Sequence, residues 1–353
     1  MPLHSWSHPA AFHRPDIIKD HLDVVVTVSN PERYRSRWKL LLEFLKHATD
    51  DRARVTLVEV AFGERAYVLD QGELEGHLPE LKGRLQVVPL RTKSEIWLKE
   101  NALNIGIQHI PTDWKYVAWI DPDITFGRHD WVGECLQQLQ HFHVLQMFSE
   151  AQDLSYKHET LKTYKSFMYC YSQNRTAIPV GINGHPIKMP PGVQEGDYAL
   201  PSKEGVSYWH PGFAWAARRQ AINDLGGLID WGILGGGDTF MAYALIGMLN
   251  SRTMPRSLGA TGVRWLQEWQ ARAERYVRRN VGHMDGTILH HWHGNRNVRG
   301  YKDRGQILVG AHFNPDLDIK RDWQGLYQLT DRCGQLRDDA RDYFRRRDED
   351  ATY

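Results

Sequence analysis

The chain has 353 residues, enough to bury a large core in one extended domain or in one and a half. Its 44 lysines and arginines and 43 acidic residues give a formal net charge of +1, which argues against nucleic-acid binding by bulk charge and leaves open a local basic patch. The cysteines, Cys135, Cys170 and Cys333, match no zinc or redox spacing and favour a reducing compartment. The sequence begins without a signal-peptide pattern and contains no apolar run of membrane-spanning length, so we expect a cytoplasmic protein.

Four apolar, β-branched runs alternate with amphipathic stretches in the first part of the chain. They are expected to form strands buried on both faces, at residues 23–28, 54–61, 85–90 and 116–120. Strands that alternate with helices predict a mostly parallel sheet, so we interpret residues 21–150 as a nucleotide-binding half that follows an irregular arm, residues 1–20. The first strand is not followed by a Gly-x-Gly-x-x-Gly segment or a Walker lysine motif, which argues against a dinucleotide enzyme and a P-loop NTPase.

Two helices are expected between these strands. The first covers residues 32–47, with Ser29 or Asn30 as its N-cap and Pro31 in its first turn. The second covers residues 93–108, where apolar residues recur at broadly helical spacing. Each helix would connect two parallel strands.

The strand expected at residues 116–120 runs directly into Asp121-Pro122-Asp123. A buried strand that ends in two acids puts negative charge at the carboxyl edge of a sheet, where open α/β sheets bind ligands. Neighbouring carboxylates repel each other unless a cation lies between them, and oxygen ligands favour a hard ion such as magnesium or manganese. The residues therefore suggest a metal–diphosphate site. The alternative is a polar turn after a core strand.

Residues 151–208 differ in character from the sequence before them. Polar residues punctuated by glycine and proline give no regular pattern. Because a long irregular segment inside a compact domain is usually functional, we interpret it as an active-site lid. Regular patterns resume at residues 209–216, and helices are expected over residues 218–225 and 239–249.

Three glycines and an acid, Gly235-Gly236-Gly237-Asp238, precede the last of these helices. The glycines would let the backbone approach a ligand closely and would hold the carboxylate of Asp238 near a helix N-terminus. The alternative is a tight turn in which Asp238 is an ordinary N-cap. The segment alone leaves both open.

Three histidines lie within four residues in a strand-like run at residues 287–293. In an alternating strand His291 and His293 share a face and His290 lies on the opposite one, unless a bulge intervenes. The run is followed by the basic residues Arg296, Arg299 and Lys302. So many histidines and cations together favour a ligand site over simple packing. An Arg-rich amphipathic helix is expected before them, over residues 264–280, and a charged helical tail with a solvated face after them, over residues 331–353.

These segments, in this order, resemble the metal-dependent glycosyltransferases of the GT-A fold, which use nucleotide-sugar donors. The resemblance is to galactosyltransferase-like and family 2-like members and covers about residues 22–301. It implies an α/β fold with a Rossmann-like mixed, mostly parallel sheet flanked by helices. It also implies a lid-like insertion at residues 151–208, an acceptor and catalytic half at residues 209–305 and a C-terminal helical extension at residues 306–353.

The resemblance also implies roles for individual residues. Donor nucleotide or sugar would contact Thr27, Ser29, Asn30, Glu59, Lys99, Asn104, Asp121, Gly236, Gly237, Arg296 and Arg299. Mn²⁺ or Mg²⁺ would be bound by Asp121 and Asp123 with a histidine from among His290, His291 and His293. Candidates for stacking on the acceptor, or else core residues, are Trp209, Trp215 and Trp231. Asp238 would be the catalytic base of an inverting reaction, although Gly237 stands where the family has an acceptor-orienting Glu.

Two other functions stay open at this point. A nucleotidyltransferase or sugar-nucleotide pyrophosphorylase could use a similar sheet, although residues 29–34 are not the Gly-rich basic loop that such enzymes carry. A non-catalytic nucleotide- or glycan-binding module would need no base. A UDP-sugar is the expected donor. The acceptor would be a glycan, a protein or a hydroxymethylated DNA base, and residues 264–280 and 296–304 would be the patch that contacts DNA.

Overall fold

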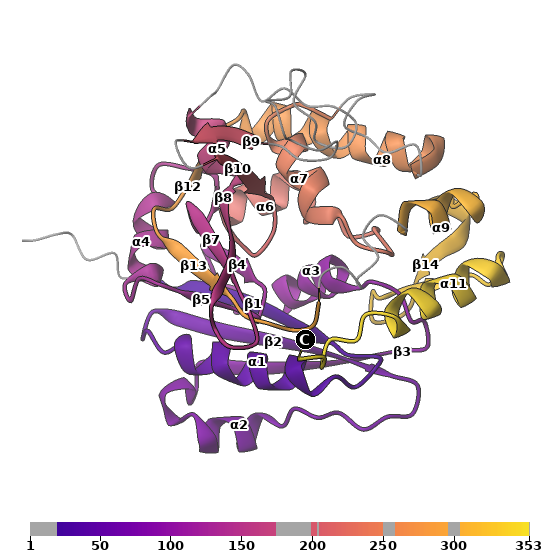
Figure 1. Cartoon of the computed structure of the whole chain (residues 1–353), viewed down its shortest axis with the longest axis horizontal. Helices are drawn as coiled ribbons and strands as arrows, with labels where there is room; N and C mark the ends of the chain where they lie inside the picture. The colour runs from indigo at the N-terminus through magenta and orange to yellow at the C-terminus, as the bar shows by residue number, and fades with distance from the viewer. Residues whose placement is uncertain (1–19, 174–198, 203–204, 250–257, 296–303, 353) are drawn as a thin grey trace, which may run out of the picture.

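A computed structural model describes residues 20–173, 199–202, 205–249, 258–295 and 304–352. Nearly all of the arm expected at residues 1–20 lies outside these ranges, as do Arg296, Arg299 and Lys302. Helices and strands form two sheets with helices packed around them, and a small hairpin forms a third sheet (Figure 1). Among the described residues, no helix is both long and apolar enough to cross a membrane.

The first half of the chain alternates strands with helices, as the sequence predicts. Its elements are β1 (Leu22–Ser29), α1 (Arg35–His47), β2 (Ala53–Phe62), α2 (Gln71–His77), a 3₁₀ turn (Pro79–Leu81), β3 (Leu85–Thr92), α3 (Lys99–His109), β4 (Tyr116–Ile120), β5 (Ile124–Phe126), α4 (Trp131–Gln138) and β6 (Val144–Gln146). The four predicted strands correspond to β1, β2, β3 and β4.

The second half is less regular. Its elements are β7 (Glu150–Leu154), β8 (Thr160–Ser166), α5 (Phe167–Gln173), β9 (Ala199–Ser202), β10 (Gly205–His210), β11 (Ala214–Arg218), α6 (Arg219–Leu225), α7 (Gly237–Leu245), α8 (Gly259–Arg272), a π-helical turn (Ala273–Val277), β12 (Val281–His283), β13 (Thr287–His290), α9 (Arg304–Gly310), α10 (Pro315–Asp318), β14 (Ile319–Arg321), β15 (Tyr327–Leu329) and α11 (Gly334–Arg345).

The main sheet has seven strands in the order β12-β6-β11-β4-β1-β2-β3. β1 pairs in parallel with β2 and β4, β2 with β3, and β12 with β6, whereas β11 runs antiparallel between β4 and β6. The sheet is therefore mixed and mostly parallel, as predicted. Its topology brings the carboxyl ends of β1 and β4 to one edge. Ser29 is the last residue of β1, and Asp121 comes directly after β4.

Both faces of the main sheet are buried by helices. Successive residues of β1 alternate between two apolar clusters, with Val24 and Val26 facing α1 and α2, and Val25 facing α3. Figure 1 shows α1 and α2 below the sheet and α3 above it. Gly106 lets α3 approach closely, because a Cβ there would lie 2.5 Å from Cγ1 of Val25. This burial on both faces explains the continuous apolar runs of the sequence.

A second, six-stranded sheet has the order β5-β13-β7-β8-β10-β9. Residues 151–173, expected to begin an irregular lid, form instead most of the β7–β8 hairpin and α5. The outer face of this hairpin is polar, with Glu150 opposite Lys165 at 2.8 Å, which concealed the strand pattern. The rest of the predicted lid falls largely at residues 174–198, outside the described ranges.

Helices α1 and α7 begin at places that the sequence did not predict. α1 begins at Arg35, because the side chain of Asn30 closes a turn onto Tyr34: its Oδ1 accepts from the Tyr34 N–H and its Nδ2 donates to the Tyr34 carbonyl. α7 has Gly236 as its N-cap with a φ of 98°, a left-handed conformation that suits glycine. Asp238 is therefore the second residue of α7 and not its cap.

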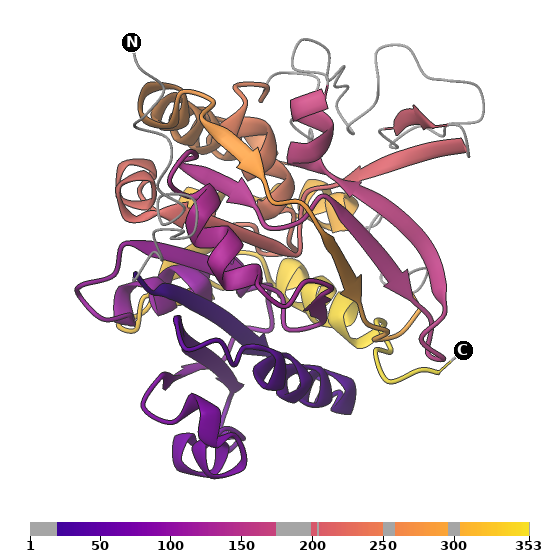
Figure 2. The same ribbon diagram turned by 90° about the vertical axis from the view of Figure 1, so that its left-hand side faces the viewer.

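The C-terminal extension contains the β14–β15 hairpin in addition to α9, α10 and α11. The tail has the expected solvated face, but it also has a buried side that was not expected. Tyr343 and Phe344 of α11 are buried, and Arg347 and Glu349 beyond it are only 3% and 1% exposed. The chain turns back after α11, so the C terminus lies near α1 and beside the long strands of the second sheet (Figures 1 and 2). Charge density alone did not distinguish a solvated tail from one held by ion pairs.

Candidate metal centre and active-site cavity

A cavity of about 430 Å³ opens at the carboxyl ends of β1 and β4. Its polar and charged lining comes from β1, α1, α3, the β4–β5 loop, the end of β10, α7, the end of β13 and the turn after it, α9 and the C-terminal segment. These side chains include Thr27, Ser29, Arg37, Lys99, Glu100, Asp121, Asp123, His210, Asp238, His290, His293, Arg304, Arg347 and Glu349. The volume is in the range of small-molecule binding sites.

Asp123, His290 and His293 converge at one end of this cavity. Their candidate ligand atoms all lie within 4.8 Å of one another. Oδ2 of Asp123 lies 3.1 Å from Nε2 of His293 and 3.7 Å from Nε2 of His290, and the two Nε2 atoms are 3.2 Å apart. Oδ1 of Asp123 is buried with no hydrogen-bond partner among the described residues. One carboxylate and two imidazoles pointing at one place, with an oxygen left over, fit a divalent metal ion.

The end of β13 selects which histidines meet. β13 stops at His290, so the two-residue alternation stops with it, and the turn that follows brings His293 next to His290. The strand alternation under which His291 and His293 would share a face therefore does not reach these residues. The His291 N–H donates to the Asp123 carbonyl, while its ring lies 2.7 Å from Oγ1 of Thr125, outside the cluster.

Each clustered histidine has a carboxylate on its far side. Nδ1 of His290 lies 2.8 Å from Oδ1 of Asp153, and Nδ1 of His293 lies 3.8 Å from Oε2 of Glu349. Burial opposes the charged form of His290, but Asp123 and Asp153 raise the pKa of its imidazole to about 8. Burial also opposes the charged form of Asp123, but the two imidazoles hold its pKa well below the usual range. The cluster is thus built to hold opposite charges close together.

Asp121 lies outside this cluster. Its Oδ1 is 2.5 Å from Nζ of Lys99, the first residue of α3. Burial raises the pKa of Asp121 and the ammonium of Lys99 opposes that rise. Of the two acids that the sequence proposed as metal ligands, the structure therefore brings only Asp123 to the histidines. Lys99, predicted to contact the donor, does line the cavity.

Asp238 lines the cavity on the side of α7. Oδ2 of Asp238 lies close to Gly212: a Cβ on Gly212 would be only 2.6 Å from this oxygen. A second acid, Glu100, lies nearby on α3 and accepts a 2.9 Å hydrogen bond from Nε1 of Trp97. Burial raises the pKa of Glu100 to about 7, with Lys99 opposing the shift. Such values suit acid–base chemistry near neutral pH.

Glu100 occupies the space beside Gly237. A Cβ on Gly237 would lie 3.0 Å from Cδ of Glu100. Gly237 stands where the resembled family carries an acid, and here an acid from α3 fills that place. Gly237 does not line the cavity, whereas Gly236 does. The sequence analysis missed Glu100 because an acid in the first turn of a helix is an ordinary feature.

Other predicted residues have structural roles outside the cavity. Glu59 is buried and accepts hydrogen bonds from the N–H groups of Val68 and Leu69. Asn104 bonds to the backbone of Leu228 and to the carboxylate of Asp230, and so ties α3 to the segment before α7. Neither residue contacts the cavity that holds the metal cluster.

Among the predicted acceptor residues, two tryptophans belong to the core. Trp215 stacks on Trp119 with an interplanar angle of 4°, and Trp231 packs edge-on against Trp265. The side chain of Trp209 lies outside the described part of the structure. The aromatic surface of the cavity comes instead from Trp97, from Phe213 and from the α11 residues Tyr343 and Phe344. Those α11 residues carried no pattern that marked them as functional.

Comparison with known proteins gives matches among solved structures alone. No family model matches the chain, and no curated protein matches it. The catalytic domain of Drosophila β1,4-galactosyltransferase 7 in complex with xylobiose is 12% identical with a TM-score of 0.29, and the match covers 63% of this chain and 59% of that one. The chain therefore spans less than two thirds of that structure.

Further matches are bacterial. Glucosyl-3-phosphoglycerate synthase of Mycobacterium tuberculosis, in complex with Mg²⁺ and uridine diphosphate, is 10% identical with a TM-score of 0.37, and the match covers 82% of this chain and 77% of that one. The 4-diphosphocytidyl-2C-methyl-D-erythritol synthase of Anaerococcus prevotii is 9% identical with a TM-score of 0.33, with coverage of 76% and 88%. A putative nucleotide-diphospho-sugar transferase from Desulfovibrio desulfuricans is also among the similar solved structures, with 11% identity, a TM-score of 0.30 and coverage of 82% and 94%.

Proposed function

We propose that the protein is a metal-dependent glycosyltransferase that moves a sugar from a nucleotide-diphosphate sugar to a hydroxyl acceptor. One observation carries the proposal: Asp123, His290 and His293 converge in a cavity that also contains a candidate base, Asp238, and the cation of Lys99. A binding module needs a cation site but no base. This set therefore favours catalysis.

The ion would be Mn²⁺ or Mg²⁺, held by Asp123, His290 and His293. When bound, it supplies a Lewis acid that neutralises the charge on a departing diphosphate. Two nitrogen ligands favour Mn²⁺ over Mg²⁺, which prefers oxygen. Lys99, held beside Asp121 by a 2.5 Å ion pair, adds a charge-assisted contact for the same phosphates.

In the proposed reaction the oxygen of the acceptor hydroxyl attacks the anomeric carbon of the donor. The bond from that carbon to the diphosphate oxygen breaks, and its electron pair leaves with the nucleoside diphosphate. The hydroxyl proton passes to the carboxylate of Asp238 as general base. A single displacement of this kind inverts the anomeric centre. Glu100, whose pKa is about 7, is placed to hold a second acceptor hydroxyl.

The donor proposed for the cavity is a UDP-sugar, with its nucleotide near Thr27 and Ser29 at the end of β1. For the acceptor, a glycan or a protein is favoured over a DNA base. Two arginines of α8, from the patch expected to contact DNA, are engaged within the chain: Arg264 lies 2.8 Å from Asp316, and Arg272 donates to the Leu225 carbonyl.

The test of this proposal is a thermal-shift screen of nucleoside diphosphates and nucleotide sugars with Mn²⁺, with Mg²⁺ and with chelator. A ligand at about a hundred times its Kd adds about 2.7 kcal/mol of stability, which raises Tm visibly. The expected result is a shift that needs both the metal and one nucleotide sugar. Donor hydrolysis in the same mixtures should release nucleoside diphosphate, whereas release of pyrophosphate from a nucleoside triphosphate and a sugar 1-phosphate would identify a nucleotidyltransferase.

Replacing Asp238 tests the base. Asp238→Asn should lower kcat about 10²- to 10⁴-fold with donor affinity nearly unchanged, because the amide keeps the shape but accepts no proton. Asp224→Asn, at the end of α6, is the matched control, since Asp224 does not line the cavity. Normal turnover by Asp238→Asn would remove Asp238 from the mechanism.

A further inference from the structure

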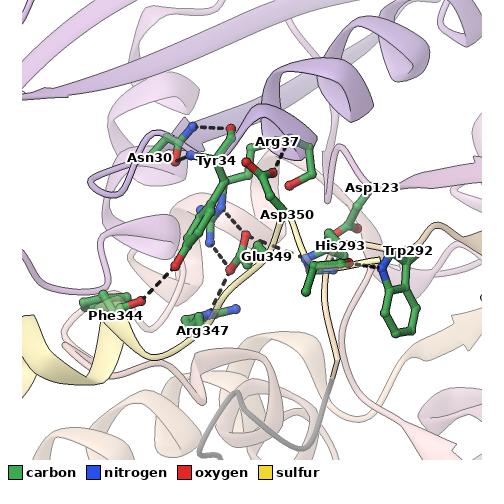
Figure 3. Close-up of polar contacts among 12 residues, drawn as sticks. Asn30, Tyr34, Arg37, Asp123, Trp292, His293, Phe344, Arg347, Glu349 and Asp350 are labelled. Carbon is green, nitrogen blue, oxygen red and sulfur yellow. Dashed lines mark hydrogen bonds and ion pairs between the residues drawn. The ribbon is translucent and has the colours of Figure 1, made fainter. Parts of the chain in front are cut away.

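The segment that follows α11 runs past the candidate metal centre, where Glu349 lies beside His293. It runs between the start of α1 and the turn at residues 292–294 (Figure 3). Glu349, in its middle, is 1% exposed although it belongs to a highly charged stretch. Burying a carboxylate costs free energy unless charged partners and hydrogen bonds compensate for it, so its contacts need an explanation.

Glu349 is held by two guanidinium groups. Its Oε2 lies 2.5 Å from Nε of Arg37, and its Oε1 lies 2.7 Å from Nη2 of Arg37 and 2.8 Å from Nε of Arg347. The Arg37 pair is therefore bidentate, the geometry with the most directional specificity. Burial opposes the charge on Glu349, but the guanidiniums and the ring of His293 hold its pKa well below the usual range. The carboxylate is thus fixed in position as an anion.

Glu349 lies on the Nδ1 side of His293, as Asp153 lies on the Nδ1 side of His290, but at 3.8 Å where Asp153 is at 2.8 Å. In both histidines Nε2 faces Oδ2 of Asp123, and Nδ1 faces a buried carboxylate. A carboxylate behind Nδ1 fixes the orientation of an imidazole and leaves Nε2 free to bind a metal. Each histidine therefore has a carboxylate on its Nδ1 side, hydrogen-bonded from the second sheet for His290 and at ion-pair distance from the C-terminal segment for His293.

We propose that the C-terminal segment, residues 346–352, completes the metal centre, with Glu349 orienting His293 as a ligand so that metal binding and docking of the segment stabilise each other. Glu349 is a positioning residue, since it contacts the ligand and not the ion. The inference rests on the metal centre of the proposed function. Because thermodynamic coupling is reciprocal, whatever undocks the segment should weaken metal binding, and the metal should hold the segment in place.

Besides the Glu349–Arg37 ion pair, further contacts hold the segment against the rest of the protein. The carboxylate of Asp350 accepts from the N–H groups of Arg35 and Ser36, at 2.9 and 2.8 Å, and so caps α1, which has no cap of its own. Nε1 of Trp292 donates to the Ala351 carbonyl at 2.6 Å. Gly294 allows a close approach, since a Cβ there would lie 2.5 Å from the Asp348 carbonyl oxygen. These contacts join the start of α1, the histidine turn and the segment.

The opposite role, a plug that competes with ligand for the cavity, does not fit the geometry. The side chain of Glu349 has no exposed surface. It also lies on the Nδ1 side of His293, whereas Nε2 faces Asp123. A competing carboxylate would lie on the Nε2 side, where the ion binds.

The deciding measurement is the affinity for Mn²⁺ alone, followed by EPR of unbound Mn²⁺ without any donor or acceptor. Glu349→Gln should weaken Mn²⁺ binding about 10- to 100-fold, the usual effect of removing such a carboxylate. Asp338→Asn, which removes one negative charge from the exposed face of α11, should bind as the wild type does. Equal or tighter binding by Glu349→Gln would overturn the proposal. A wild type that binds no Mn²⁺ would instead remove the metal centre and the proposed function with it.

A second variant covers the case in which Glu349→Gln fails to fold, because that change leaves two buried guanidiniums with less compensation. Trp292→Phe keeps an aromatic ring and removes only the donor to the Ala351 carbonyl. It should release the C-terminal residues to carboxypeptidase faster than the wild type does, and Mn²⁺ should slow the digestion of both proteins. Digestion rates of the wild type that are the same with Mn²⁺ and with chelator would overturn the coupling.

Discussion

Asp153 offers the sharpest test of how the metal centre is held. It lies on β7, is 6% exposed, and places Oδ1 2.8 Å from Nδ1 of His290. Asp153→Asn keeps the size of the side chain and removes its charge. The amide is a weaker acceptor, so it no longer increases the basicity of the His290 ring, and its NH₂ group can turn toward Nδ1 and favour the wrong tautomer.

The magnitude follows from the burial of this pair. Removing a carboxylate behind a ligating histidine typically weakens metal binding about 10- to 100-fold, which at 1.36 kcal/mol per decade is about 1.4 to 2.7 kcal/mol. Solvent does not screen this contact, because His290 is also only 6% exposed. We therefore expect an effect near the upper end of that range.

The assay is Mn²⁺ binding by EPR or calorimetry, with the unfolding free energy measured in parallel. Asp70→Asn is the matched control, since Asp70 caps α2 on the far side of the main sheet and asparagine caps a helix equally well. Unchanged Mn²⁺ affinity in Asp153→Asn, with the fold intact, would refute the argument that Asp153 supports a metal ligand.

Two further predictions concern stability. Burial raises the pKa of Glu100 from 4.5 to about 7, so between these pH values the folded protein binds a proton that the unfolded chain has released. The unfolding free energy of the wild type should therefore fall by about 3 kcal/mol from this group as the pH rises from 4.5 to 7. Glu100→Gln should lack this fall when urea unfolding is compared at pH 5 and pH 8. Equal pH dependence in the two proteins would contradict it. Gly106→Ala should lower the unfolding free energy by about 1 to 3 kcal/mol, because the new Cβ would lie 2.5 Å from Cγ1 of Val25 and 2.7 Å from Cγ2 of Val58. An unchanged urea midpoint would show that α3 can shift to make room for the methyl group.

Strands β1 to β4 of the main sheet could be predicted from the sequence because burial on both faces leaves a local pattern, whereas β6 and β12, of three residues each, were not predicted. β4 begins and ends at the predicted residues, and β1 extends the prediction by one residue at each end. The β7–β8 hairpin was missed because one of its faces is polar, so it has no continuous apolar run. The start of α1 was missed because its capping carboxylate, Asp350, is far away in sequence.

The candidate site also contains some residues that could be predicted from the sequence and others that could not. Asp123 and the histidine run are visible in sequence, since each is a dense local group of potential ligands. The choice of His290 and His293 depends on where β13 ends, which tertiary pairing decides. Asp153 and Glu349 lie in ordinary polar and charged stretches, and only the fold brings them to the histidines. A carboxylate gains such a role from its neighbours in space, which a local pattern does not record.

The contact between Gly237 and Glu100 makes two distant positions of the chain interdependent. A Cβ at residue 237 would meet the Ile229 carbonyl oxygen at 2.9 Å and Glu100 at 3.0 Å, so the space beside α7 that Glu100 fills has no room for a second side chain. An acid on α7 at this position would need a smaller residue in place of Glu100 and a shift of the backbone at Ile229. Among related chains a glutamate at one of these positions should accompany a small residue at the other, and exchange of the acid between the two helices would need both changes together.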